Sequence, residues 1–102
     1  MGYQVKLSRS ARLDIEDIVR YISIDDASQA LRFGKFLVQS TKGLVDFPER
    51  GRVVPEFGDK SIREIVVRAY RIVYRLNHEE QSVEVVRIWH AARGIPNINP
   101  LN

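Results

Sequence analysis

Arginine and tryptophan side chains alternate along two neighbouring β-rich stretches of this 102-residue chain. The residues concerned are Arg71, Arg75, Arg87 and Trp89, with Arg93 shortly after them. A guanidinium group grips phosphate or carboxylate through paired hydrogen bonds, and an indole ring offers a stacking or anchoring surface. We therefore predict a surface that binds nucleic acid or an acidic protein. The open alternative is an ordinary polar face, since one side of an antiparallel sheet is commonly wet.

The same region contains candidates for acid–base chemistry. Metal-free RNA cleavage needs a base for the ribose 2′-hydroxyl, a cation for the developing phosphate charge and an acid for the leaving oxygen. Arg71 is a suitable cation and Glu56 or Glu64 a candidate base, while His90 has the intrinsic chemistry of an acid or a base. A nuclease mechanism would thus rest on Arg71, Glu56 and His90.

The sheet that positions these residues is expected to contain strands at 62–67, 70–76 and 83–90, which are rich in branched and aromatic residues. Keeping apolar residues opposite one another defines a register of three pairs, Tyr74 with Val86, Ile72 with Ile88 and Tyr70 with His90. Arg71, Arg75, Arg87 and Trp89 then share the face opposite the apolar one.

A register shifted by one residue would pair Arg75 with Glu84. It would also turn Arg87 toward the core, which costs more than a surface ion pair returns. The unshifted register points His90 toward the apolar layer, so a half-buried structural histidine is its favoured interpretation. His78, in the polar loop 77–82, is assigned no functional role.

Two amphipathic helices precede the sheet. Apolar stripes at 11, 15, 18 and 22 and at 30, 33, 37, 41 and 44 fit helical spacing. Ser8 or Ser10 is expected to cap the first helix and Asp26 the second, while Pro48 ends the second. Asp14 lies on the polar side of the first helix and is expected to face water.

The combined pattern predicts an α+β fold. A short strand at 3–7 is followed by an antiparallel two-helix hairpin, packed on a mainly antiparallel sheet of about four strands, with a brief edge strand at 53–57. Residues 1–94 form one domain in this interpretation, and residues 95–102 form a flexible tail.

Composition narrows the functional classes. The formal net charge of +3 and the sequence pI near 9.5 permit a nucleic-acid or acidic partner without requiring one. The sequence contains no cysteine, so it has neither disulfides nor a cysteine metal site. No apolar run is long enough to span a membrane. We therefore expect a cytoplasmic protein without metal or cofactor.

The order of motifs resembles that of the RelE/ParE toxin superfamily of bacterial type II toxin–antitoxin systems, which includes plasmid stabilisation proteins. The matching segments cover nearly the whole chain: Ala11-x-x-Asp14-Ile15-x-x-Ile18, Phe47-Pro48-x-x-Gly51-Arg52, Pro55-Glu56, Arg63-Glu64, Tyr70-Arg71-Ile72-Val73-Tyr74 and Val86-x-Ile88-Trp89-His90-x-x-Arg93. The closing His90-Ala91-Ala92-Arg93 is more similar to ParE-like members, which typically carry a further arginine where Ala92 stands.

This resemblance implies a growth-inhibiting toxin that a cognate antitoxin neutralises in a hetero-oligomer. ParE-like members poison DNA gyrase, which would make Arg71, Arg75, Arg87, Trp89 and Arg93 candidates for target binding. RelE-like members instead cut messenger RNA on the ribosome, and Arg71 matches the arginine that they place in this strand. A relative that binds antitoxin but has lost toxicity is the third possibility. The incomplete acid–base set favours the ParE-like function.

Overall fold

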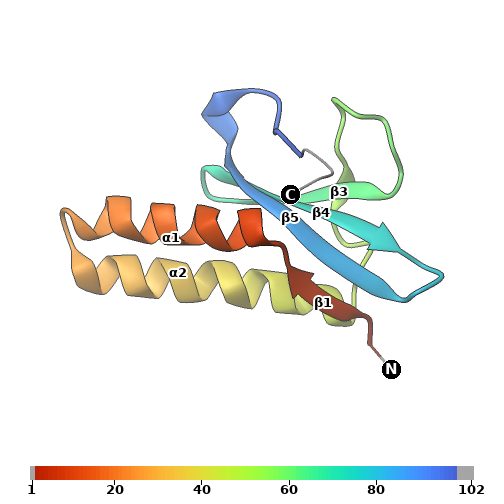
Figure 1. Ribbon diagram of the computed structural model, residues 1–102, viewed down its shortest axis with the longest axis horizontal. Helices are drawn as coiled ribbons and strands as arrows, with labels where there is room; N and C mark the ends of the chain where they lie inside the picture. Colours follow the sequence, from red (N-terminus) through yellow and green to blue (C-terminus); the bar gives the residue numbers. More distant parts are fainter. Residues whose placement is uncertain (1, 99–102) are drawn as a thin grey trace.

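The computed structural model describes residues 2–98 and has an α+β architecture with one helical layer on one sheet (Figure 1). Its elements are β1 (Gln4–Leu7), α1 (Arg9–Ser23), α2 (Ala27–Lys42), the 3₁₀ turn η1 (Gly43–Val45), β2 (Arg52–Val53), β3 (Ile62–Val67), β4 (Tyr70–Asn77), β5 (Ser82–His90) and the 3₁₀ turn η2 (Ala91–Arg93). The five strands lie in the order β1-β5-β4-β3-β2. Only the β1–β5 pairing in this sheet is parallel. The predicted α+β fold is confirmed, and β1 joins the sheet of four predicted strands as its fifth member.

Both helices begin at the predicted caps. The Ser8 hydroxyl accepts a hydrogen bond from the Ala11 amide at 3.0 Å, and the Asp26 carboxylate accepts one from the Gln29 amide at 3.0 Å. The helices lie side by side on one face of the sheet (Figure 1). A Cβ atom at Gly34 would lie 2.8 Å from a methyl group of Val19, so glycine permits this close approach. Within the described residues no helix is long and apolar enough to cross a membrane.

The strand register is correct over half of the central hairpin and wrong over the other half. Tyr70 pairs with His90 and Ile72 with Ile88 as predicted, but Tyr74 pairs with Val85 instead of Val86. A β-bulge at this point leaves Val86 as an extra residue of β5. The bulge turns Val85 toward the helices and keeps Arg87 on the opposite face. The hairpin therefore follows the predicted register on one side of the bulge and the register shifted by one residue on the other.

The larger core lies between the helices and the sheet. Its fully or nearly buried members come from every layer and include Ala11, Ile18, Leu37, Leu44, Ile72, Tyr74, Leu76, Val83, Val85 and Ile88. The predicted helix stripes therefore face the sheet as expected. Ile72 and Leu37 have no exposed surface, so substitutions at these two positions test the packing of this layer directly.

The opposite face of the sheet, predicted to be open and polar, carries a second apolar cluster. Val54, Ile62, Val73 and Val86 are buried there, with Phe57 and Ile98 packed against them. The chain after β2 and the segment 94–98 cover this part of the sheet. β2 spans only Arg52–Val53, shorter than the predicted strand at 53–57, because the chain turns away at Val54 to make this cover.

Replacing Ile72 or Leu37 with alanine should lower the free energy of unfolding by roughly 2–5 kcal/mol, because each substitution removes buried surface and leaves a cavity. The matched control is Leu13→Ala in α1, since the Leu13 side chain is 47% exposed and its truncation should cost less than about 0.5 kcal/mol. Denaturant unfolding of the three variants checks this. Equal losses for Leu13 and Ile72 would show that the helical layer does not pack as described.

Candidate functional site

Arg71 lies at the centre of an ion-pair network on the non-helical face of the sheet. Its Nε donates to the buried carboxylate of Glu64, which also accepts a hydrogen bond from Arg52 Nε at 2.7 Å. Its Nη1 and Nη2 donate to the two oxygens of Glu56 at 2.8 and 2.7 Å. We call these four residues the Arg71 network. Two carboxylates thus already bind the guanidinium group that the sequence suggested as a phosphate-binding cation.

The network also shifts the pKa of two of its members, Glu56 and Arg71. Hydrogen bonds from Arg71 are the main reason that the pKa of Glu56 is lowered to about 2. Hydrogen bonds to Glu56 and then to Glu64 raise the pKa of Arg71. Glu56 is therefore an ionised carboxylate with little affinity for a proton, which makes it a poor general base.

Arg87 is occupied in a similar way, but by a helix. Its Nε and Nη2 donate to Asp14 of α1 at 2.8 and 2.9 Å, and its Nη1 donates to the Asn97 carbonyl at 2.9 Å. The backbone amide of Ile88 donates to the same Asp14 carboxylate at 2.9 Å. The expectation that Asp14 faces water is wrong, because this carboxylate ties α1 to β5. The hydrogen bonds to Asp14 raise the pKa of Arg87.

The end of β5 carries a stack of guanidinium and indole groups. Trp89 is buried, and the guanidinium carbons of Arg87 and Arg93 lie 4.9 and 4.0 Å from its ring centre. Arg93 itself is exposed. Arg75 lies apart from this stack, further along β4 opposite Glu84. The five predicted binding residues are thus divided: Arg71 and Arg87 pair with acids, Trp89 supports Arg93, and Arg75 is separate.

His90 has a clear structural role. Its Nδ1 accepts a hydrogen bond from the Ala92 amide at 3.1 Å, and its ring meets the edge of Tyr70 at 5.1 Å between centres. The side chain therefore caps the η2 turn after β5. Glu56 lies with Arg71, and His90 lies on the helical side of the strand end. The three candidate nuclease residues do not converge on one face.

Tyr74 locks a loop in a way that the sequence analysis missed. Its hydroxyl donates to the Pro48 carbonyl at 2.7 Å and accepts from the Gly51 amide at 2.9 Å. Burial raises the pKa of this phenol. A Cβ atom at Gly51 would lie 2.5 Å from the Glu64 carbonyl, so glycine is required at this close approach. In the sequence, the Phe47-Pro48-x-x-Gly51 motif is the feature that could have indicated this loop contact.

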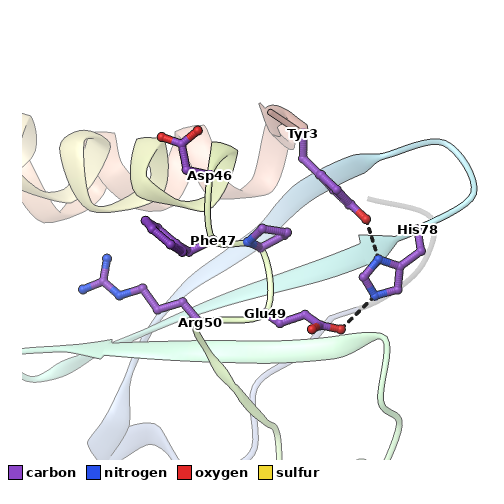
Figure 2. A pocket seen from close by; sticks show the side chains of 7 residues that line it. Tyr3, Asp46, Phe47, Glu49, Arg50 and His78 are labelled. Carbon is purple, nitrogen blue, oxygen red and sulfur yellow. Dashed lines mark hydrogen bonds and ion pairs between the residues drawn. The ribbon is translucent and has the colours of Figure 1, made fainter. Parts of the chain in front are cut away.

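A second missed feature is an open pocket of about 520 Å³ beside this loop (Figure 2). Its lining comprises Tyr3, Asp46, Phe47, Pro48, Glu49, Arg50 and His78. Figure 2 shows His78 between Tyr3 and Glu49, with hydrogen bonds of 2.6 and 3.0 Å to them. His78 therefore joins the β4–β5 loop to Tyr3, just before β1, and to the loop after η1. Among the described residues, no group of three or more acidic or histidine side chains is arranged to hold a metal ion.

Lowering the pH should weaken the contribution of Glu56 to stability. The pKa of Glu56 is about 2 in the folded chain and 4.5 without the contacts of the fold. The contribution of Glu56 to stability is therefore complete above about pH 4.5 and is lost as the pH falls through 2. The stability difference between the wild type and Glu56→Gln should therefore shrink between pH 5 and pH 2 in denaturant unfolding. Glu79→Gln, at an exposed loop position, is the control. A difference that stays constant with pH would contradict the Arg71 network.

The chain is similar in sequence and in fold to known proteins. The profile of a family described as "ParE toxin of type II toxin-antitoxin system, parDE" matches residues 5–95. The chain is 34% identical over 94 residues to "Toxin RelE1" of Caulobacter vibrioides, covering 88% of this chain and 95% of that protein. Solved structures with a similar fold include the chromosomal ParDE system of P. aeruginosa, with a TM-score of 0.71, 18% identity and coverage of 87% of this chain and 96% of that chain. The RelBE2 complex of Mycobacterium tuberculosis gives a TM-score of 0.67 with 20% identity, covering 88% of this chain and 99% of that chain.

Proposed function

The chain belongs to the ParE toxin family of type II toxin–antitoxin systems, within the RelE/ParE superfamily, and on this premise we propose that it inhibits growth by binding DNA gyrase. We further propose that it acts in the cytoplasm and that a cognate antitoxin neutralises it in a hetero-oligomer. The similar structures from P. aeruginosa and M. tuberculosis are of toxin–antitoxin systems, which supports such a partner.

The Arg71 network is the observation that carries the preference for protein binding over RNA cleavage. Every nitrogen of the Arg71 guanidinium already donates to a carboxylate, so binding a phosphate would require breaking charge-assisted bonds in a buried setting. Glu56, held with a pKa of about 2, has little capacity to accept the proton of a ribose hydroxyl. Within residues 2–98, Arg71 is thus not a free cation and Glu56 is not a matched base, although RelE-like chemistry would need both.

Target binding instead uses the exposed end of β5 in this proposal. Arg93 projects from the η2 turn and is held against the Trp89 ring, which limits the motion of a long side chain before any partner arrives. Arginine residues that are oriented in advance are frequent anchors of protein interfaces. Arg93 is therefore the contact residue and Trp89 its support.

One observation favours the nuclease alternative. The Caulobacter vibrioides relative carries the name RelE1, and RelE-like members act on messenger RNA. A relative without toxicity is the remaining alternative, and it would inhibit neither target.

Purified protein should inhibit supercoiling by gyrase and leave messenger RNA intact in a translating extract. Arg93→Ala and Trp89→Ala should each weaken inhibition by roughly tenfold or more, because an anchor residue contributes at least about 1.4 kcal/mol. Arg12→Ala, at an exposed α1 position, is the matched control and should inhibit as the wild type does. Adding the protein encoded beside this gene should restore supercoiling.

Two results would contradict this function, and a third would contradict only the assigned contact surface. Codon-positioned cuts in messenger RNA with unaffected supercoiling would establish the RelE-like alternative. Inhibition of neither process by folded protein would identify a non-toxic relative. Equal inhibition by Arg93→Ala and the wild type would place the contact surface elsewhere.

A further inference from the structure

A second pocket lies where α1 passes the end of β5, on the helical side of the sheet. It has a volume of about 390 Å³ and is lined by Asp14, Asp17, Ile18, Tyr21, Tyr70, Ile88, His90 and Arg93. The lining thus comes from α1, β4, β5 and η2. Neither the Arg71 network nor the hydrogen-bonded pocket of Figure 2 contributes to it.

Three aromatic side chains offer this pocket hydrogen-bond donors that the described residues do not use. His90 Nδ1 accepts from the Ala92 amide, so the neutral imidazole carries its proton on Nε2 and can donate from there. The hydroxyls of Tyr21 and Tyr70 have no hydrogen-bond partner within residues 2–98. Burial, and then the neighbouring Tyr21, raise the pKa of Tyr70, which agrees with two phenols close together in a partly desolvated site.

The two carboxylates that line the pocket have ion-pair partners, whereas its guanidinium group does not. The Asp14 carboxylate is taken up by Arg87 and by the Ile88 amide, and the Asp17 carboxylate pairs with Arg20 at 3.1 Å. Arg93 has no carboxylate partner within the described residues, and its guanidinium carbon lies over the Trp89 ring. The pocket therefore offers one guanidinium group without a carboxylate partner and several neutral hydrogen-bond donors, and together these suit an anion.

We propose that this pocket receives the carboxylate of an aspartate or glutamate side chain from the target protein. This inference rests on the proposed function and names the chemistry that Arg93 recognises. A single carboxylate suits the site better than a nucleic-acid backbone, because one charge meets less repulsion from the Asp14 and Asp17 carboxylates in the wall than a run of phosphates does. The ring edges of Tyr70 and His90 would surround the aliphatic part of the incoming side chain.

The first test uses isolated protein and small probes, without gyrase. N-acetyl-glutamate methylamide should shift the backbone amide resonances of Tyr21, His90 and Arg93 with a dissociation constant on the order of 1 mM. N-acetyl-glutamine methylamide, its neutral isostere, should bind about tenfold more weakly, since it lacks the charge that strengthens such hydrogen bonds. Arg93→Gln and Tyr21→Phe should weaken binding of the charged probe, whereas Tyr3→Phe, a matched change outside the pocket, should not.

Equal binding of the two probes would overturn the proposal, and so would resonance shifts scattered over the surface. Tighter binding of a nucleoside monophosphate than of the glutamate probe would overturn it in favour of a nucleotide site. Tyr21 is 74% exposed, so Tyr21→Phe tests the hydroxyl without threatening the fold.

The second test separates this inference from the proposed function. Tyr21→Phe should weaken gyrase inhibition several-fold, and an excess of the glutamate probe should relieve inhibition by the wild type. Inhibition that neither change affects would overturn the pocket assignment and leave the gyrase proposal standing. Specific binding of the glutamate probe by a protein that does not inhibit gyrase would have the opposite meaning, supporting the carboxylate site and rejecting gyrase as the partner.

Discussion

The buried carboxylate of Glu64 is the constraint on which much of the structure depends. An ionised side chain with no exposed surface is tolerated only where charged hydrogen-bond donors surround it. Glu64 obtains Arg71 from β4 and Arg52 from β2, so the charge joins three adjacent strands. Glu56 then binds the remaining nitrogens of Arg71 and holds the chain after β2 beside the sheet.

The same arrangement limits what the sheet can do chemically. A guanidinium group that is already neutralised by two carboxylates stabilises little additional charge, and a carboxylate paired with it accepts a proton only in strong acid. At the end of β5, Arg93 rests on Trp89 and has no carboxylate partner within the described residues. The proposal of protein recognition rests on this contrast between paired charges in the centre of the sheet and a cation presented at its edge.

The sequence predicted the elements well and their long-range polar contacts poorly. Helix stripes, caps and strands follow from local spacing, and the apolar pattern of Tyr70, Ile72 and Ile88 was sufficient for half of the hairpin register. The β-bulge was missed because only two uniform registers were considered: one loses the pairing of Arg75 with Glu84, and the other turns Arg87 toward the core. The bulge removes both costs, pairing Arg75 with Glu84 while Arg87 stays on the non-helical face.

The candidate site was harder to predict for a related reason. A strand of alternating arginines has the same pattern whether its cations are free or paired, and the paired acids are distant in sequence. Asp14 lies 73 residues before Arg87, and Glu56 lies 15 residues before Arg71. A surface-helix aspartate and a loop glutamate carry no local sign of such partners. Exposure of Arg93 and burial of Trp89 likewise depend on how the chain turns after β5.

A double-mutant cycle between Arg71 and Glu64 tests most directly whether the network, rather than either charge alone, stabilises this face of the sheet. Unfolding free energies would be measured for the wild type, Arg71→Met, Glu64→Leu and the double variant. Each single change leaves a buried charge with one ion-pair partner fewer, so the double variant should be more stable than the sum of the single effects by at least about 1 kcal/mol. Effects that add to within roughly 0.3–0.5 kcal/mol would contradict the network and return Arg71 to the role of a free cation.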